Sequence, residues 1–267
     1  MKKLTISFLL LLTLAVSFSC KKNDDPKPGT TPGTNNTAGK CFVTKIMYGE
    51  DFSVDYTYNS AMEVTKITHK EDPAEEGFSY QFTRDVSGRI TTLDFFEGKE
   101  KLGHGNLTYG IDNTLTKIDI FSMENGVPVN DFRLEFEHNS LKQLTKYKMV
   151  DPNSGLTENY MLLTYDTRGN VIKEERHRIE DGKDEIEEIL EFEYDDKKNP
   201  MLVARMPFYM ESATEISQNN VTRIIEKSPS GSTYSTTIAY QYNEQGYPKT
   251  SASGSNDETN TYEYICK

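Results

Sequence analysis

The chain has 267 residues, of which 42 are Asp or Glu and 30 are Lys or Arg, so its formal net charge is -12 at pH 7. Because phosphate contacts need clusters of Lys and Arg, this balance argues against a nucleic-acid partner. After an N-terminal leader, residues 41–267 are long enough to bury a substantial core as a single domain.

Residues 1–19 have the pattern of a signal peptide. Two lysines precede an apolar run from Leu4 to Phe18, which is too short for a comfortable membrane span. The run ends in small residues followed by Cys20. This end resembles a bacterial lipobox, in which Cys20 becomes the lipidated N-terminus of the processed protein. The alternative is an ordinary secretory signal that contains a cysteine.

The residues after Cys20 predict a location and a tether. Lys21 resembles the residue that follows the cysteine in lipoproteins sorted to the outer membrane, and Asn23-Asp24-Asp25 resembles an export tag for the cell surface of Gram-negative bacteria. The periplasm-facing side of the outer membrane is the alternative location. Residues 20–40 are rich in Pro, Gly and Asn without a large apolar residue, which predicts a disordered stalk. Membrane contact is expected through the lipid anchor only.

A repeated pattern organises residues 41–267. An aromatic or aliphatic residue, a polar residue and an aromatic residue precede Asp or Asn, and an aliphatic residue follows five positions later. This turn position falls at 59, 85, 110, 139, 166, 195 and 243, with Gly at 110 and the acid displaced to Asp112. Alternation at period 2 and a polar turn are typical of a β-hairpin. The first six turn positions are 25 to 29 residues apart. A nearly constant period of this length marks an array of such units, about 16 to 18 strands in all.

Three parts of the pattern are less regular. The last interval is 48 residues, long enough for a degenerate copy, and Asn219–Ile224 looks like its second half. The unit ending at Asp195 is expected to continue into a strand at Pro200. Residues 183–194 fit both a helix and a strand, and the repeat favours the strand.

Three cysteines occur, and two remain if Cys20 carries the lipid. Cys41 opens the first expected strand and Cys266 lies near the end of the last. A closed up-and-down sheet with an even number of strands would bring the two together, as a disulfide requires. Two unpaired thiols at fraying ends are the alternative.

The expected fold is therefore all-β, a large antiparallel meander rolled into a barrel or a flattened closed sheet, with an open twisted sheet as the alternative. Tyr and Phe side chains are expected inside and charged side chains outside. A membrane-spanning barrel also alternates, but residues 173–178 are six consecutive polar residues, which indicates a strand that is wet on both faces. These residues favour a soluble barrel.

Two motifs resemble known families. Tyr165-Asp166-Thr167-Arg168-Gly169-Asn170 resembles the YD repeats of RHS-type secreted proteins, whose strands spiral into large β shells. Residues 194–201 and 217–224 resemble signatures of a surface-lipoprotein family of unknown function with a porin-like β fold. That resemblance implies a barrel-like shape and supplies no catalytic residue. Met62 in one turn and Arg84 in place of an aromatic residue depart from the pattern.

The sequence offers no catalytic, cofactor-binding or metal-binding constellation. The four histidines are scattered, and His138 stands at a repeat position where it substitutes for a core tyrosine. Acidic clusters at 71–76 and 180–188 are expected to be solvated loops. Most of the 16 tyrosines fall on the face expected to be buried, and those outside that register, candidates for stacking on a sugar, are Tyr160, Tyr209 and Tyr247.

The favoured hypothesis is a non-enzymatic surface lipoprotein, a binding or structural module for a glycan or protein ligand. One alternative is a glycan-active hydrolase with a carboxylate pair in the mouth of the barrel. The other is an accessory subunit of an outer-membrane uptake or adhesion complex.

Overall fold

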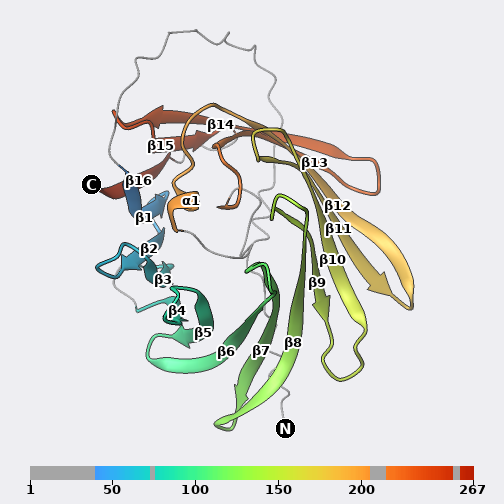
Figure 1. The fold of residues 1–267 in the computed structure, drawn as a ribbon. Helices are drawn as coiled ribbons and strands as arrows, with labels where there is room; N and C mark the ends of the chain where they lie inside the picture. The colour runs from blue at the N-terminus through green and yellow to red at the C-terminus, as the bar shows by residue number, and fades with distance from the viewer. Residues whose placement is uncertain (1–39, 73–75, 205–214, 255–258) are drawn as a thin grey trace.

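The computed structural model describes residues 40–72, 76–204, 215–254 and 259–267. Its strands form one closed antiparallel barrel in which every strand pairs with its neighbours in the chain and the last pairs with the first (Figure 1). The predicted all-β meander and its closure are confirmed. Within these described residues, the sixteen strands and one short helix are β1 (Cys41–Tyr48), β2 (Phe52–Tyr58), β3 (Val64–Lys70), β4 (Phe78–Arg84), β5 (Ile90–Glu97), β6 (Glu100–Tyr109), β7 (Leu115–Glu124), β8 (Val127–His138), β9 (Leu144–Val150), β10 (Thr157–Tyr165), β11 (Val171–Glu180), β12 (Lys183–Tyr194), α1 (Met201–Ala204), β13 (Val221–Lys227), β14 (Thr233–Tyr242), β15 (Pro248–Ser253) and β16 (Thr259–Cys266).

The Asp or Asn of the repeat shapes the turn between an even-numbered strand and the next odd-numbered strand. Asn59 donates its backbone N–H to the Glu63 carbonyl at 2.9 Å. Its side-chain oxygen accepts the backbone N–H groups of Ala61 and Glu63, both at 3.0 Å. The turns that begin at residues 85, 139, 166 and 243 repeat these bonds. A side chain that satisfies two backbone donors explains why the repeat requires Asp or Asn. We call the end of the barrel that carries these turns the Asx rim.

The fourth residue of each such turn has left-handed backbone geometry. It is Gly in three turns, where Gly88, Gly169 and Gly246 have φ angles of 82°, 90° and 81°. A Cβ atom added to Gly169 would lie 3.1 Å from the Gln218 side chain, whereas one added to Gly246 would meet nothing within 4 Å. These two glycines therefore separate backbone strain from steric contact.

Replacing Gly246 with alanine is expected to cost about 1 kcal/mol of unfolding free energy from left-handed strain alone. Replacing Gly169 is expected to cost about 1–2 kcal/mol, because the new methyl group must also displace Gln218. Urea denaturation of the two variants measures both values. Equal losses would show that the contact with Gln218 contributes nothing.

Among its described residues, 195–204 and 215–243, the 48-residue interval contains no further copy of the repeat. The Asp195 side-chain oxygen accepts the backbone N–H groups of Lys197 and Asn220, at 2.9 and 3.1 Å. These are the bonds of an ordinary turn, with residues 196–219 enlarging it. The expectation that a strand begins at Pro200 is wrong, since Pro200 precedes α1 and β13 begins at Val221. Residues 219–224 are the second half of the unit that turns at Asp195, and not, as expected, of a separate degenerate copy.

The eighth unit is divided between the first and last strands of the barrel domain. β16 carries the aromatic residues Tyr262 and Tyr264, and β1 supplies the second strand. In place of a turn, a disulfide joins Cys41 to Cys266, with the Cα atoms 4.0 Å apart. Just beyond it, Lys40 and Lys267 exchange two backbone hydrogen bonds of 2.9 and 3.0 Å. The first and last described residues therefore lie together on the Asx rim.

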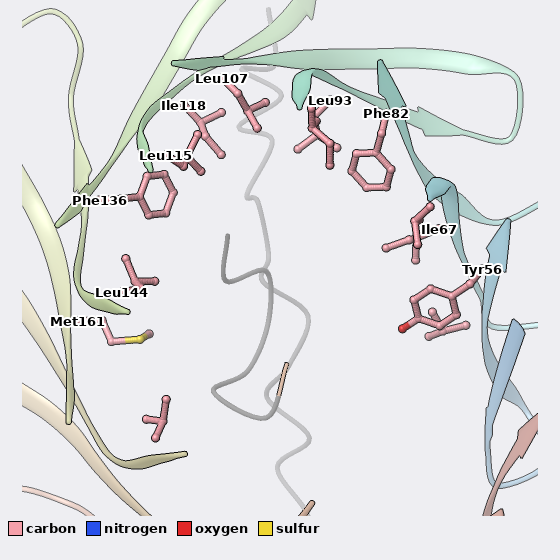
Figure 2. Packing of buried hydrophobic residues seen from close by; sticks show 14 of the residues in the cluster. Tyr56, Ile67, Phe82, Leu93, Leu107, Leu115, Ile118, Phe136, Leu144 and Met161 are labelled. Carbon is pink, nitrogen blue, oxygen red and sulfur yellow. The ribbon is translucent and has the colours of Figure 1, made fainter. Parts of the chain in front are cut away.

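The two faces of the wall differ in chemistry. Large apolar side chains, among them Tyr56, Phe82 and Phe136, point into the barrel (Figure 2). The alternate positions are charged and form cross-strand ion pairs such as Asp119–Arg133 at 2.7 Å. The prediction of aromatic residues inside is confirmed. A charged outer wall is the reverse of the apolar band that lipid-facing barrels present.

β12 confirms the strand interpretation of residues 183–194. Leu190, Phe192 and Tyr194 occupy one face of it and pack against the core. The strand pairs on both sides, with β11 and β13, so backbone hydrogen bonding to two neighbours overrides the helical spacing.

Among the described residues, no helix has the length and apolarity needed to cross a bilayer.

Candidate functional site in the barrel interior

A belt of tyrosines lines the inner wall near the Asx rim. Each phenol hydroxyl donates to a backbone carbonyl near the start of the preceding odd-numbered strand. Because that strand belongs to the previous hairpin repeat, each bond ties one repeat to the next. Burial raises the pKa of several of these hydroxyls well above its ordinary value. The donor and acceptor pairs are Tyr58–Val43, Tyr109–Ile90, Tyr165–Leu144, Tyr194–Val171, Tyr240–Val221 and Tyr264–Pro248, at 2.5–2.9 Å.

Arg84 takes the place of a tyrosine in this belt. Its Nη2 donates to the Val64 carbonyl at 3.1 Å and its Nη1 to the Gly88 carbonyl at 2.8 Å. The departure of the second unit from the repeat is therefore a change of donor and not a change of register. His138 stands at the same position of β8 and is half-buried, and burial lowers the pKa of its imidazole.

The enlarged turn after β12 forms a cap on the inner side of the belt. We define the cap as residues 196–204 and 215–219. The Asn199 side chain donates to the Ser217 carbonyl at 2.8 Å, and the Ser217 hydroxyl accepts the Val171 backbone N–H at 3.1 Å. Asn219 and Asn170 exchange two hydrogen bonds of 2.9 and 3.1 Å. Because Asn170, Asn199 and Ser217 are buried and these polar groups bond one another, they fix the cap to the wall.

The cap reaches from the β12–β13 hairpin to the strands on the other side of the chain closure. α1 packs against β1, and the Tyr56 hydroxyl of β2 donates to the Met201 sulfur at 3.7 Å (Figure 1). The cap therefore lies inside the barrel at its Asx end. The opposite rim, formed by the other set of connections, carries no corresponding insertion among the described residues.

A charged cluster interrupts the apolar inner wall on β11 and β12. Arg176 donates to Glu174 at 2.6 Å and to Glu188 at 2.7 Å. Glu174 pairs across the strands with the buried Leu163 and is 0% exposed, so this carboxylate lies inside the barrel. Burial raises the pKa of Glu188, with Glu226 and Glu174 acting in the same direction while Arg176 opposes them. The cluster offers a guanidinium and a carboxyl group of raised pKa to the interior.

The sequence signal for this cluster was the polar run at residues 173–178. Interpreting that run as a strand wet on both faces is wrong at Glu174, whose carboxylate is fully buried. Its neighbour Arg176 supplies the opposite charge that makes burial tolerable. Polar residues in a strand therefore did not mean solvent on both sides.

A second polar cluster lies on the outer wall. Asp184 accepts hydrogen bonds from Tyr160 at 2.5 Å and pairs with His177 Nδ1 at 2.8 Å, and the Tyr160 and His177 rings stack at 4.3 Å. The bond to Asp184 raises the pKa of Tyr160 to about 12. The same hydroxyl, and next His177, lower the pKa of Asp184. Since Lys146 Nζ covers the Tyr160 ring at 4.4 Å, this ring is not a free platform for a sugar.

The other candidates fall as follows. Cys20, Glu75 and Tyr209 lie outside the described residues. Tyr247 was expected outside the buried register but is buried beside Phe42 at the disulfide, which corrects that expectation. The acidic run at 180–188 belongs to the β11–β12 hairpin and is largely exposed until Glu188. Among the described residues, no three His, Cys, Asp or Glu side chains are grouped to hold a metal ion.

The buried phenols predict a specific loss of stability at alkaline pH. Burial raises the pKa of Tyr147 to about 12, while an unfolded tyrosine ionises near 10. Above pH 10 the unfolded chain releases protons that the folded barrel retains, so unfolding becomes more favourable as pH rises. We expect a loss of roughly 1 kcal/mol per such tyrosine by pH 11. Tyrosinate absorbance should therefore rise together with loss of the β-sheet circular dichroism signal, and a gradual rise in the intact barrel would contradict this.

Comparison with known proteins finds distant structural likenesses and no family. No protein-family model matches the chain, and no curated protein is similar to it. The barrel is similar to a porin-like protein from Bacteroides uniformis ATCC 8492, at 13% identity and a TM-score of 0.43 over 84% of this chain and 98% of that chain. A porin-like protein from Bacteroides vulgatus ATCC 8482 gives 10% identity and a TM-score of 0.40 over 84% and 99%. The TcdB2-TccC3-TEV structure gives 13% identity and a TM-score of 0.31 over 79% of this chain and 13% of that chain.

These likenesses are too distant to carry an activity from one protein to the other. The resemblance of residues 194–201 and 217–224 to a surface-lipoprotein family, and of Tyr165–Asn170 to YD repeats, stays a prediction.

Proposed function

We propose that the protein is an outer-membrane lipoprotein, anchored through Cys20 and exposed at the cell surface, whose barrel is a non-enzymatic binding module. The charged outer wall supports this proposal, because such a wall gives the barrel no means of its own to span a bilayer. A barrel of this kind needs a separate attachment to stay at a membrane, and the lipobox-like segment ending at Cys20 supplies one.

The observation that best supports ligand binding is the group of exposed apolar side chains on the opposite rim. The β7–β8 and β11–β12 hairpins contain the longest strands, β8 and β12, and the residues of these two strands nearest the opposite rim are exposed. A closed barrel has no free strand edge, so a peptide cannot add a strand to it. A glycan or protein ligand is therefore expected at the rim. The exposed apolar residues there include Val127, Val129, Leu156, Ile186 and Tyr234.

The anchor is tested by replacing Cys20 with alanine in the producing cell. We expect wild-type protein to incorporate labelled fatty acid, to sediment with outer membranes and to be cut by protease added to intact cells. The Cys20→Ala variant should lose all three properties. Wild-type protein that carries no acyl group would remove the anchor from the proposal.

Ligand binding is tested by presenting the protein to panels of host and dietary glycans and of peptides. For any ligand found, Leu156→Ser and Tyr234→Ser should weaken binding, whereas Val86→Ser on the Asx rim should leave it unchanged. Silence across both panels would remove the binding role.

A second candidate, a glycan-active hydrolase, is favoured by one observation. Glu174 and Glu188 both flank Arg176 on the inner wall, and the pKa of Glu188 is raised as a general acid requires. Release of sugars from the same glycan panel would support it, provided that Glu188→Gln abolishes release and the exposed Glu187→Gln does not. A third candidate, an accessory subunit of an uptake or adhesion complex, would be supported by co-purification with a membrane barrel.

A further inference from the structure

Three neighbouring turns of the Asx rim carry aliphatic side chains at their tips. Val86, Ile111 and Leu141 are 108%, 111% and 76% exposed. The turns that carry them connect β4 to β5, β6 to β7 and β8 to β9, which are consecutive around the barrel. We call these three residues the aliphatic tips.

The turn itself does not require aliphatic residues at these positions. The aliphatic tips are the second or third residue of their turns. In the turns that begin at Asn59, Asp166 and Asn243, the second and third residues are Ser-Ala, Thr-Arg and Glu-Gln. Those turns make the same backbone hydrogen bonds as the turns of the aliphatic tips. Because turn geometry does not select Val, Ile and Leu here and the side chains are exposed, they are available to contact an apolar partner.

Side-chain bonds between the turns hold the three tips together as one surface. Arg89 Nη1 donates to the Asn113 side-chain oxygen at 3.2 Å and so joins the first turn to the second. Lys142 Nζ donates to the Asp112 carbonyl at 2.6 Å and joins the third turn to the second. The surface therefore presents the aliphatic tips beside Arg89, which also pairs with Asp85 of its own turn at 2.7 Å, and Lys142. Aliphatic and cationic side chains together suit the boundary between acyl chains and phosphate head groups.

The point at which the chain enters the barrel favours a membrane as the partner of this surface. Lys40 lies on the Asx rim, where it pairs with Lys267, and twenty residues of sequence separate it from Cys20. A lipid anchor at Cys20 would therefore join the barrel at the Asx rim, and not at the opposite rim.

We infer that the Asx rim docks on the lipid bilayer that holds the anchor, with the aliphatic tips inserted among the head groups and the opposite rim facing away. This inference rests on the proposed lipid anchor for its natural setting. The occupant of the surface is a phospholipid bilayer and not a protein.

The test uses a chain in which a hexahistidine tag replaces residues 1–20, bound to phosphatidylcholine vesicles that contain a nickel-chelating lipid. This tether works whether or not Cys20 is acylated in the cell. With Cys41 and Cys266 joined, a single introduced cysteine carries an environment-sensitive fluorophore at position 86, 111 or 141. Matched controls carry it at Val127, on the opposite rim, and at Glu244, a polar tip on the same rim.

Spin labels on the lipid acyl chains are expected to quench the fluorophore at 86, 111 and 141 and to leave it unquenched at 127 and 244. In the background Val86→Ser, Ile111→Ser and Leu141→Ser, a fluorophore at Ser87 should lose the quenching that it shows in the unsubstituted chain. Equal quenching at all positions, absence of quenching at the tips, or quenching at 127 alone would overturn the inference. Absence of acylation on Cys20 would sink the proposed anchor only, because the nickel-tethered measurement is independent of it.

Discussion

A chain in which Cys41 and Cys266 are both replaced by alanine is expected to lose about 5 kcal/mol of unfolding free energy. The two cysteines are 225 positions apart, so the disulfide constrains nearly the whole unfolded barrel domain. The chain-entropy estimate for a loop of this length is about 5 kcal/mol, and it acts on the unfolded state. The midpoint of guanidinium denaturation, measured under non-reducing conditions, gives the loss.

The native contacts around the cysteines should survive this substitution. β1 and β16 still pair along their length, and Lys40 and Lys267 still exchange backbone hydrogen bonds. We therefore expect the circular dichroism spectrum of the folded variant to match that of the wild type. Wild-type protein kept in a reducing agent should show the same midpoint as the variant, and the agent should not affect the variant. An unchanged midpoint on reduction would contradict the prediction.

Replacing Arg176 with methionine is expected to destabilise the barrel by about 3–5 kcal/mol. Glu174 is fully buried and lies 2.6 Å from the guanidinium, and Glu188 lies 2.7 Å from it. Methionine fills much of the arginine volume, so the loss measures the removal of positive charge from between two carboxyl groups. Urea denaturation at pH 7 provides the measurement.

Two matched variants test the cause of that loss. Arg178 lies two positions along the same strand and is 57% exposed, so Arg178→Met should change stability by less than about 0.5 kcal/mol. Adding Glu174→Gln to Arg176→Met removes the buried negative charge and should restore part of the stability. If the double variant is no more stable than Arg176→Met, packing and not charge explains the effect.

The repeat made the architecture predictable because one physical requirement recurs in most turns of the Asx rim. A side chain such as Asn59 or Asp166 must satisfy two backbone N–H groups, and the aromatic residues before it must face inward. Local chemistry of this kind is visible in sequence. It located the turns, and with them the strands and the order in which they pair.

The enlarged turn after Asp195 could not be predicted from spacing. Pro200 stands at the distance where the next strand normally begins, and only the bonds from Asp195 to Lys197 and Asn220 show that the turn closes after Asn219. The cap that results depends on contacts between distant residues, such as Asn170 with Asn219. A repeat register carries no information about such contacts.

The charged cluster and the aliphatic tips show the same limit in two ways. Alternation marks Glu174 as polar without showing that Arg176 shares its buried surroundings. Val86 and Ile111 are hydrophobic and would be assigned to a core on composition, yet the turn directs them into solvent. In both cases the position in the barrel, and not the residue type, decides what the side chain contacts.

The divided eighth unit has a consequence for how the chain could be rearranged. Since Lys40 and Lys267 already meet where the other units have a loop, a short linker could join them and new termini could be opened at another loop, such as the one at Asn125-Gly126. Such a circular permutant should still fold into the same ring. In a closed ring of this kind every strand has two neighbours, so the position of the chain termini does not decide which strands pair.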